Sequence, residues 1–349
     1  MRSNSLFVHG GLLLLASGLA YAGFTKSAPA SGSQRLEVQV YSGTPAQLER
    51  VEFSTENRTV SLVAKSDKAG RYFVGELSRQ KPAPHVAKSA DAGAQPPAPP
   101  PETEKLTFVA VSSMDKLAEQ LAPLSAYRSL GKLQDAQLAE FGFDKPEGKL
   151  TITLAGKVHS LILGGTTPGG ADRYVKDQTS GIAYAILGNI SRDLENADSR
   201  LTERSLHAFE PEQVTRVRIS AGEQTRELVP LAGNKSAWAG ADTPSQEDET
   251  ASNWMVKLGR LRPNKYVGEA PVSGSTPVVV VEYFEGKQRI GELQLVRGAA
   301  LPGAAGDPSA PGADAKYDYY VRTAHTRWYA SVIRSSGEQL DQDLGSVLR

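Results

Sequence analysis

The stretch that decides the fold is Leu138–Ile186, which reads LAEFGFDKPEGKLTITLAGKVHSLILGGTTPGGADRYVKDQTSGIAYAI. A short helical turn is expected up to Gly142, and Pro146 then interrupts any helix. At least four strand-like runs follow, separated by glycine-rich or polar turns. Alternation of apolar and polar residues is typical of strands with one buried face. The stretch therefore predicts an antiparallel meander.

The order of features around this stretch returns near the C-terminus. Pro45–Val51 (PAQLERV) resembles Pro211–Val217 (PEQVTRV), and Arg173–Lys176 (RYVK) aligns with Tyr319–Arg322 (YYVR). Matching features in the same order indicate an internal duplication. The sequence predicts an α+β fold of two tandem similar modules, each an antiparallel β-sheet or meander packed with one or two helices, behind an N-terminal apolar helix.

Helical spacing of apolar residues predicts three further helices. The first spans Ser112–Leu124, with Ser112 and Asp115 as its capping signal, and the second spans Ser191–Leu206. The third is expected to start at the Thr243–Gln246 pair. Arg71–Val74 is expected to be a short edge strand.

The N-terminus determines the expected compartment. Residues 6–24 are apolar, with Arg2 before them, and as a helix they would span about 28 Å, close to the thickness of a bilayer core. An uncleaved membrane anchor is one interpretation. A cleaved signal peptide is the other, because Ala20–Ala22 has the small-x-small form of a cleavage site. The expected location is an inner-membrane-anchored protein with a periplasmic or other extracytoplasmic body, or a periplasmic protein secreted after cleavage.

These patterns divide the chain into four parts, two of which carry a low-complexity segment. The expected parts are an anchor or signal peptide (1–24), a flexible tether (25–34), a first α+β module (35–207) with a Pro-rich insertion (79–104), and a second α+β module (208–349) with a Gly/Pro/Ala-rich loop (298–316).

Composition argues against several classes of function. The 39 basic and 39 acidic residues cancel, which removes the electrostatic case for nucleic acid as a partner. The chain has no cysteine, so thiolate chemistry and thiolate-bound zinc are excluded. The five histidines lack metal-ligand spacing, and Gly164–Gly170 predicts a hairpin turn, not a phosphate loop. We therefore assign no catalytic residue, cofactor or metal, and we expect a protein that is not an enzyme.

The second module concentrates aromatic residues near its end. They form our expected interaction surface, together with the arginine between them: Tyr317, Tyr319, Tyr320, Arg322, Trp328 and Tyr329. If exposed, such residues would suit a glycan or a protein partner. The competing interpretation is structural, because strand alternation divides them between two faces and aromatic residues favour strands.

The sequence resembles the domain of unknown function family 4340 (DUF4340). The residues that carry the resemblance are Leu138–Pro146, Leu163–Gly170, Arg173–Val175, Arg200–Leu201 and Phe209–Val214. Where the family's motif carries Tyr and Leu, this chain has Phe141 and Phe143, which keep the apolar bulk. The resemblance implies an N-terminal membrane anchor, an extracytoplasmic body and an association with ABC-transporter components of the gliding-motility type. It implies no catalytic residues.

Taken together, these features lead us to expect a non-enzymatic, membrane-tethered extracytoplasmic accessory or scaffold protein of an envelope transport (ABC-transporter) or motility assembly. Its partners would be the membrane, through the N-terminal helix, and an envelope or ABC-transporter protein. The alternative is a cell-envelope glycan- or peptide-binding module that uses the aromatic strands of the second module. An envelope hydrolase ranks last, and a cleft between the modules lined by histidines and carboxylates would favour it.

Overall fold

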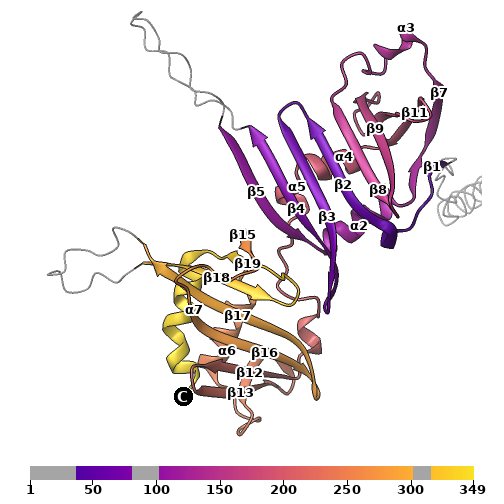
Figure 1. Ribbon diagram of the computed structural model, residues 1–349. Coiled ribbons are helices and arrows are strands. Elements are labelled where there is room, and N and C mark those ends of the chain that lie inside the picture. Colours follow the sequence, from indigo (N-terminus) through magenta and orange to yellow (C-terminus); the bar gives the residue numbers. More distant parts are fainter. Residues whose placement is uncertain (1–36, 81–101, 302–315) are drawn as a thin grey trace, which may run out of the picture.

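A computed structural model describes residues 37–80, 102–301 and 316–349. In these ranges the chain is α+β: helices pack against predominantly antiparallel sheets (Figure 1). The expected anchor (1–24) and tether (25–34) lie outside the described residues, as do most of the Pro-rich insertion and of the loop 298–316. None of the helices in the described ranges has the length and apolar character needed to cross a membrane.

The first sheet has nine strands in the order β5-β4-β3-β2-β8-β9-β10-β11-β7. Their bounds are β2 (Leu48–Thr55), β3 (Arg58–Asp67), β4 (Gly70–Gln80), β5 (Thr103–Ala110), β7 (Arg128–Lys132), β8 (Gly148–Leu154), β9 (Lys157–Thr166), β10 (Asp172–Asp177) and β11 (Ile182–Leu187). Strands β8 to β11 pair antiparallel in sequence order, so the predicted meander is confirmed. β1 (Val38–Tyr41) and β6 (Leu124–Ala126) form a separate two-stranded sheet.

The second sheet has eight strands in the order β14-β13-β12-β16-β17-β18-β19-β15. Their bounds are β12 (Arg216–Ala221), β13 (Gln224–Leu231), β14 (Asn234–Gly240), β15 (Lys265–Gly268), β16 (Thr276–Glu285), β17 (Gln288–Ala300), β18 (Tyr317–Thr323) and β19 (Tyr329–Ser331). If β5 is set aside, the two sheets place their strands in the same order. Each sheet begins with three consecutive strands (β4-β3-β2 and β14-β13-β12) and continues with four more (β8-β9-β10-β11 and β16-β17-β18-β19). The strand that precedes these four in the chain, β7 or β15, lies at the far edge.

The described residues contain six helices. They are α2 (Ser112–Leu121), α3 (Asp135–Leu138), α4 (Gly188–Glu195), α5 (Ala197–Arg200), α6 (Glu249–Gly259) and α7 (Arg334–Val347), with short 3-10 turns at Pro45–Gln47 and Pro211–Gln213. In the second half, α6 contacts β14 and α7 contacts β18. In the first half, α2 and α4 contact each other, and α4 also contacts β3 and β10.

Several predicted boundaries were wrong. α2 ends at Leu121, and the helix expected over Ser191–Leu206 is instead the two short helices α4 and α5. α6 starts after Asp248, because that carboxylate accepts a hydrogen bond from the Ala251 N–H at 2.9 Å and caps the helix. Residues 71–74 are not an edge strand: they lie in β4, and β5 pairs with β4 along its outer side.

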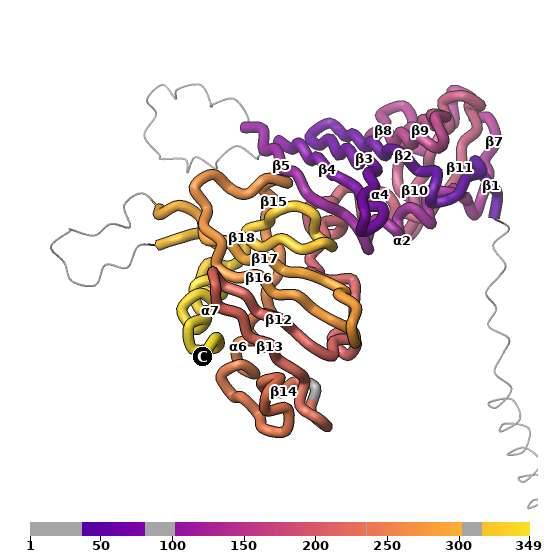
Figure 2. The backbone as a smooth tube through the Cα atoms, turned by 60° about the horizontal axis from the view of Figure 1, so that its bottom comes forward, coloured from indigo at the N-terminus to yellow at the C-terminus, as the bar shows by residue number. Residues whose placement is uncertain are grey.

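The two sheets meet at one end of each (Figures 1 and 2). β15 of the second sheet contacts β5 of the first. The turn of the β3–β4 hairpin lies against the loop that joins β18 to β19, and Arg327 of that loop pairs with Asp67. The buried core of the first sheet also takes in Tyr266 and Ala330 from the second sheet. This meeting place, which we call the junction, brings together residues that are far apart in the sequence.

Candidate functional site at the junction of the two sheets

Arg327 is the central residue of the junction. Its side chain is buried, and its φ of 59° lies in the left-handed region that residues with a Cβ rarely adopt. The guanidinium Nε lies 3.3 Å from Oδ2 of Asp67, and Nη1 donates to the His325 carbonyl at 2.6 Å. The same group lies 4.8 Å from the centre of the Tyr72 ring. Strained backbone is held only where its surroundings determine it, and here contacts from both sheets do so.

The loop around Arg327 is held by two threonines. The Thr323 N–H donates to Oγ1 of Thr326 at 2.9 Å, and the Thr326 N–H donates to Oγ1 of Thr323 at 3.0 Å. The Thr323 hydroxyl donates to the Leu206 carbonyl at 2.6 Å, and Nε of Arg322 donates to the Arg327 carbonyl at 2.7 Å. These bonds close the loop into a rigid turn.

Glu203 is the second connecting residue, and it is buried. Its Oε2 accepts the Ser112 N–H at 3.0 Å at the start of α2, and its Oε1 accepts the Ser205 N–H at 2.8 Å. Nε2 of His325 lies 3.3 Å from Oε2, an ion-pair distance without good hydrogen-bond geometry. Burial alone would raise the pKa of Glu203, but His325 and the two backbone N–H groups together lower that pKa to about 2. The carboxylate is therefore charged at neutral pH.

His207 lies on the other side of the junction. Its ring stacks on Phe209 with centroids 4.5 Å apart and meets Tyr283 edge to face at 4.6 Å. Burial, and to a smaller extent the nearby His325, lower the pKa of His207 to about 4. The imidazole of His207 is therefore neutral at neutral pH.

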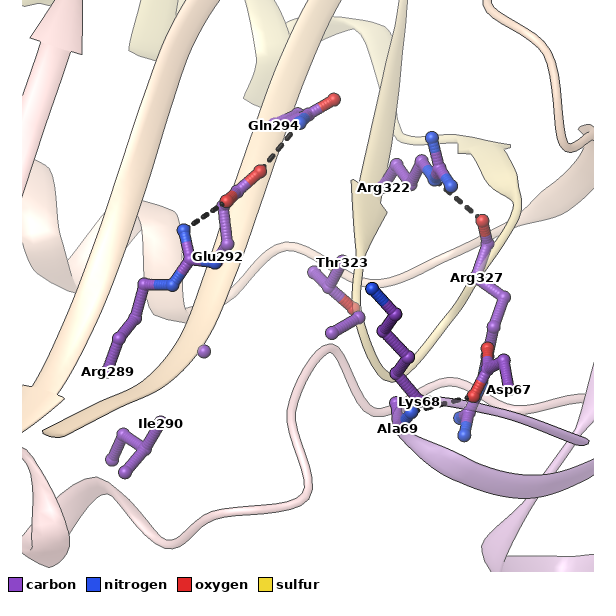
Figure 3. A pocket seen from close by; sticks show the side chains of 12 residues that line it. Asp67, Lys68, Ala69, Arg289, Ile290, Glu292, Gln294, Arg322, Thr323 and Arg327 are labelled. Atoms are coloured by element: carbon purple, nitrogen blue, oxygen red, sulfur yellow. Dashed lines mark hydrogen bonds and ion pairs between the residues drawn. The ribbon is translucent and has the colours of Figure 1, made fainter.

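A cavity of about 510 Å³ opens between the β3–β4 hairpin and the second sheet (Figure 3). Asp67, Lys68 and Ala69 line it from the first sheet, and residues of β17, β18 and the following loop line it from the second. A smaller cavity of about 220 Å³, with His207, Phe209 and His325 in its wall, shares part of the same lining. The junction therefore contains open cavities as well as direct contacts between the two sheets.

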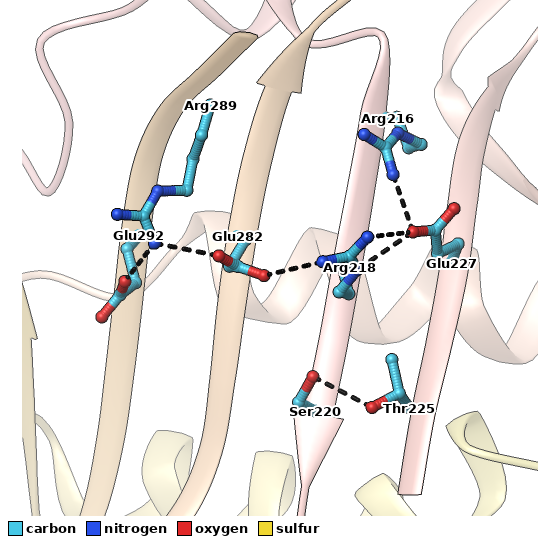
Figure 4. A network of polar contacts seen from close by, with 8 residues as sticks. All are labelled: Arg216, Arg218, Ser220, Thr225, Glu227, Glu282, Arg289 and Glu292. Carbon is cyan, nitrogen blue, oxygen red and sulfur yellow. Dashed lines mark hydrogen bonds and ion pairs between the residues drawn. The ribbon is translucent and has the colours of Figure 1, made fainter. Parts of the chain in front are cut away.

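An ion-pair ladder crosses the second sheet and ends at this cavity (Figure 4). Glu227 pairs with Arg216 at 2.7 Å and Arg218 at 2.8 Å, and Arg289 reaches Glu282 at 2.9 Å and Glu292 at 2.8 Å. Such partly exposed pairs contribute little stability individually, about 0–1 kcal/mol each. Their effect here is to fix Arg289 and Glu292 at the cavity wall.

Histidines and carboxylates line the two junction cavities, as the hydrolase interpretation required, but the hydroxyl groups beside His325 belong to the structural loop. His325 and Glu203 face each other with side chains 9% and 5% exposed, and the threonine hydroxyls beside them are engaged in the loop. Within residues 37–80, 102–301 and 316–349, no group of three His, Cys, Asp or Glu side chains is placed to hold a metal ion. The geometry is suited to joining the two sheets, and it leaves open space between them.

Comparison with known families adds one finding. Residues 105–277 match the model of a family described as a domain of unknown function, DUF4340. This chain is a DUF4340 protein. No curated protein and no solved structure matches it. The matched region contains Glu203, His207 and Tyr266, whereas Asp67 and the loop of Arg327 lie outside it.

The aromatic residues expected to form an interaction surface are divided in this DUF4340 protein. Tyr319 is buried and its hydroxyl donates to Asp341 at 2.9 Å, while Tyr329 is buried and its hydroxyl is 3.1 Å from Oε1 of Gln294. Trp328 packs partly on the first core, and its Nε1 donates to Glu269 at 3.1 Å. Tyr317, Tyr320 and Arg322 are half-buried. The six residues therefore do not form one continuous exposed surface.

Sequence analysis missed the junction residues of the DUF4340 protein. The Glu203 carboxylate accepts the N–H of Ser112, 91 positions away, and the Glu203 carbonyl accepts the hydroxyl of Tyr266, 63 positions away. Asp67 and Arg327 are 260 positions apart. No local sequence motif marks the contacts of Glu203 or the pair of Asp67 and Arg327. The one signal in the sequence was the predicted duplication, because two linked modules need an interface. His325 and Glu203 could have been proposed as residues of that interface.

Proposed function

We propose that this DUF4340 protein is a non-enzymatic, membrane-tethered extracytoplasmic accessory or scaffold protein of an envelope transport (ABC-transporter) or motility assembly. The observation that supports this most is the junction. Side chains of the two halves contact each other there: buried Arg327 pairs with exposed Asp67, and His325 faces buried Glu203. These contacts join the two sheets into one body. Such a body would act by binding partners at its surface.

We also infer that the two halves arose by duplication of one α+β module, with β5 and the Pro-rich insertion added to the first. The common strand order of the two sheets supports this. So does the 3-10 turn that precedes the first central strand in each half, at Pro45–Gln47 and at Pro211–Gln213. Each turn is closed in the same way, by a Gln side chain that accepts the backbone N–H three residues earlier.

The sequence supports the membrane attachment. The apolar run 6–24 has the length of a membrane-spanning helix, and the ten residues 25–34 have a root-mean-square reach of about 17–19 Å. The first strand, β1, starts at Val38, close behind this tether. A protein embedded in the same membrane would then be within reach of the first sheet.

Purification of the full chain from detergent-solubilised membranes after cross-linking tests this proposal. We expect an integral membrane transport protein to co-purify, and we expect recovery to fall when 25–34 is lengthened with a glycine-serine linker that moves the body away from the membrane. Capture of cell-wall glycan or peptide without any membrane protein, lost on replacing Tyr320 and Trp328 by Ala, would favour the alternative function instead.

A further inference from the structure

The cavity at the junction has an uneven charge balance. Four cationic side chains line it, Lys68, Arg289, Arg322 and Arg327, against two carboxylates, Asp67 and Glu292. Both carboxylates already have cationic partners within the cavity wall. Asp67 lies 3.3 Å from Arg327, and Glu292 lies 2.8 Å from Arg289. The remaining positive charges are those of Lys68 and Arg322.

Neither of these two cations is paired with a carboxylate in the described part of the chain. Lys68 is exposed at the turn of the β3–β4 hairpin, and Figure 3 shows its ammonium group extending towards Thr323. Arg322 uses only Nε, which donates to the Arg327 carbonyl at 2.7 Å. Its guanidinium lies 5.5 Å from the centre of the Tyr329 ring, so the group is held in place while its two terminal nitrogens stay available.

A fixed guanidinium with two free nitrogens is the arrangement that binds an oxyanion through paired hydrogen bonds. A lysine from the opposite wall supplies a second charge. The volume of about 510 Å³ lies in the range of small-molecule sites and exceeds what a bare phosphate needs. The adjoining cavity, with Phe209 and Ile290 in its wall, offers apolar space next to it.

We propose that the junction cavity binds a phosphate monoester, with the phosphate between Lys68 and Arg322 and the ester group directed towards Phe209 and Ile290. Because the site is built from both sheets, an occupied cavity would also bridge them. The phosphate could belong to a soluble metabolite or to a lipid headgroup, and the two sources share this chemistry. The proposal does not depend on the scaffold function, since a protein with another role could use the same site.

The test is equilibrium binding of inorganic phosphate and of a short-chain phosphatidic acid to the purified full chain in detergent, at constant ionic strength. We expect saturable binding that weakens about tenfold or more in Lys68→Glu and again in Arg322→Gln, the loss expected for a charge-assisted contact. Lys149→Glu is the matched control, because Lys149 is exposed on β8 and lines neither cavity. It should change binding less than twofold.

The two probes separate the sources of phosphate. Phosphatidic acid binding at least tenfold tighter than inorganic phosphate, and weakened by Lys68→Glu, indicates a lipid headgroup. Comparable binding of both, with the same dependence on Lys68, indicates a soluble ester. No saturable binding of either probe, or binding equally affected by Lys149→Glu, overturns the proposal. Because Lys68 is an exposed turn residue, circular dichroism of Lys68→Glu should match the parent and exclude loss of folding as the cause.

Discussion

Nε2 of His325 lies 3.3 Å from Oε2 of Glu203 where the two sheets meet, and the two side chains are 9% and 5% exposed. The same carboxylate accepts the first N–H of α2, so one residue caps a helix of the first half and faces a histidine of the second. The Tyr266 hydroxyl also donates to the Glu203 carbonyl at 2.8 Å. Glu203 therefore caps α2 and also takes part in the contact between the two sheets.

Replacement of Glu203 by Gln should destabilise the protein. A glutamine keeps one acceptor oxygen and presents an amide NH₂ to the other N–H, so the loss should be about 2 kcal/mol, the range for hydrogen bonds to a charged group. Urea unfolding at neutral pH measures it. Glu140→Gln, at an exposed position, should change the free energy of unfolding by less than about 0.5 kcal/mol.

The effect of Glu203 should also depend on pH. Its pKa falls from an ordinary 4.5 to about 2 in the folded protein, so the unfolded chain takes up the proton first on acidification. The stabilisation is complete above about pH 4.5 and is lost as the pH falls towards about 2. The difference between parent and Glu203→Gln should shrink in that window. A difference that stays constant there would contradict the assignment.

His207 should give the protein a second, separate sensitivity to acid. Its pKa falls from 6.5 to about 4 on folding, so its stabilising contribution is complete above about pH 6.5 and declines as the pH drops towards about 4. Between about pH 7.5 and 5 this single group should cost the parent about 2 kcal/mol of stability. His207→Phe keeps the ring against Phe209 and Tyr283 and removes the titration. Its free energy of unfolding should therefore fall less than that of the parent over this range.

Arg327 should determine whether the two sheets unfold together. Arg327→Asn keeps a residue that tolerates the left-handed backbone but removes the guanidinium from Asp67, His325 and Tyr72. We expect a loss of about 2 kcal/mol and a single thermal transition in the parent that separates into two in the variant. Arg334→Asn removes only an exposed pair with Asp318 and should leave one transition. Two transitions in the parent itself would show that the junction does not couple the sheets.

The parts of the fold that could be predicted were those with a strong local pattern. Alternation of apolar and polar residues between 148 and 186 predicted the four strands of the meander, and the helical spacing of apolar residues predicted α6. The strands β7 and β15 were missed because they are short edge strands, stabilised by their neighbours β11 and β19.

The candidate site was not predictable either, and the reason is different. The cap of α2 comes from Glu203, 91 positions away, and the predicted local signal of Ser112 and Asp115 was wrong. The aromatic residues were visible in the sequence, but their exposure was not. Tyr319 and Tyr329 are buried against polar partners on α7 and β17, and these contacts depend on how the helix and strands pack. Long-range packing determines both the cap of α2 and the exposure of the aromatic residues.

The packing of α7 on the second sheet provides a matched pair of glycine substitutions. A Cβ at Gly337 would lie 2.4 Å from Cβ and Cγ of Tyr319, closer than packed atoms can approach, whereas a Cβ at Gly345 on the same helix meets nothing within 4 Å. Gly345→Ala should stabilise the protein by up to about 1 kcal/mol, the intrinsic helix preference of Ala over Gly. Gly337→Ala gains the same preference but must displace Tyr319 from Asp341, so we expect a net loss of about 1–3 kcal/mol. Thermal unfolding of the two variants measures the opposite signs. If both stabilise the protein equally, α7 does not pack against Tyr319 as the structure shows.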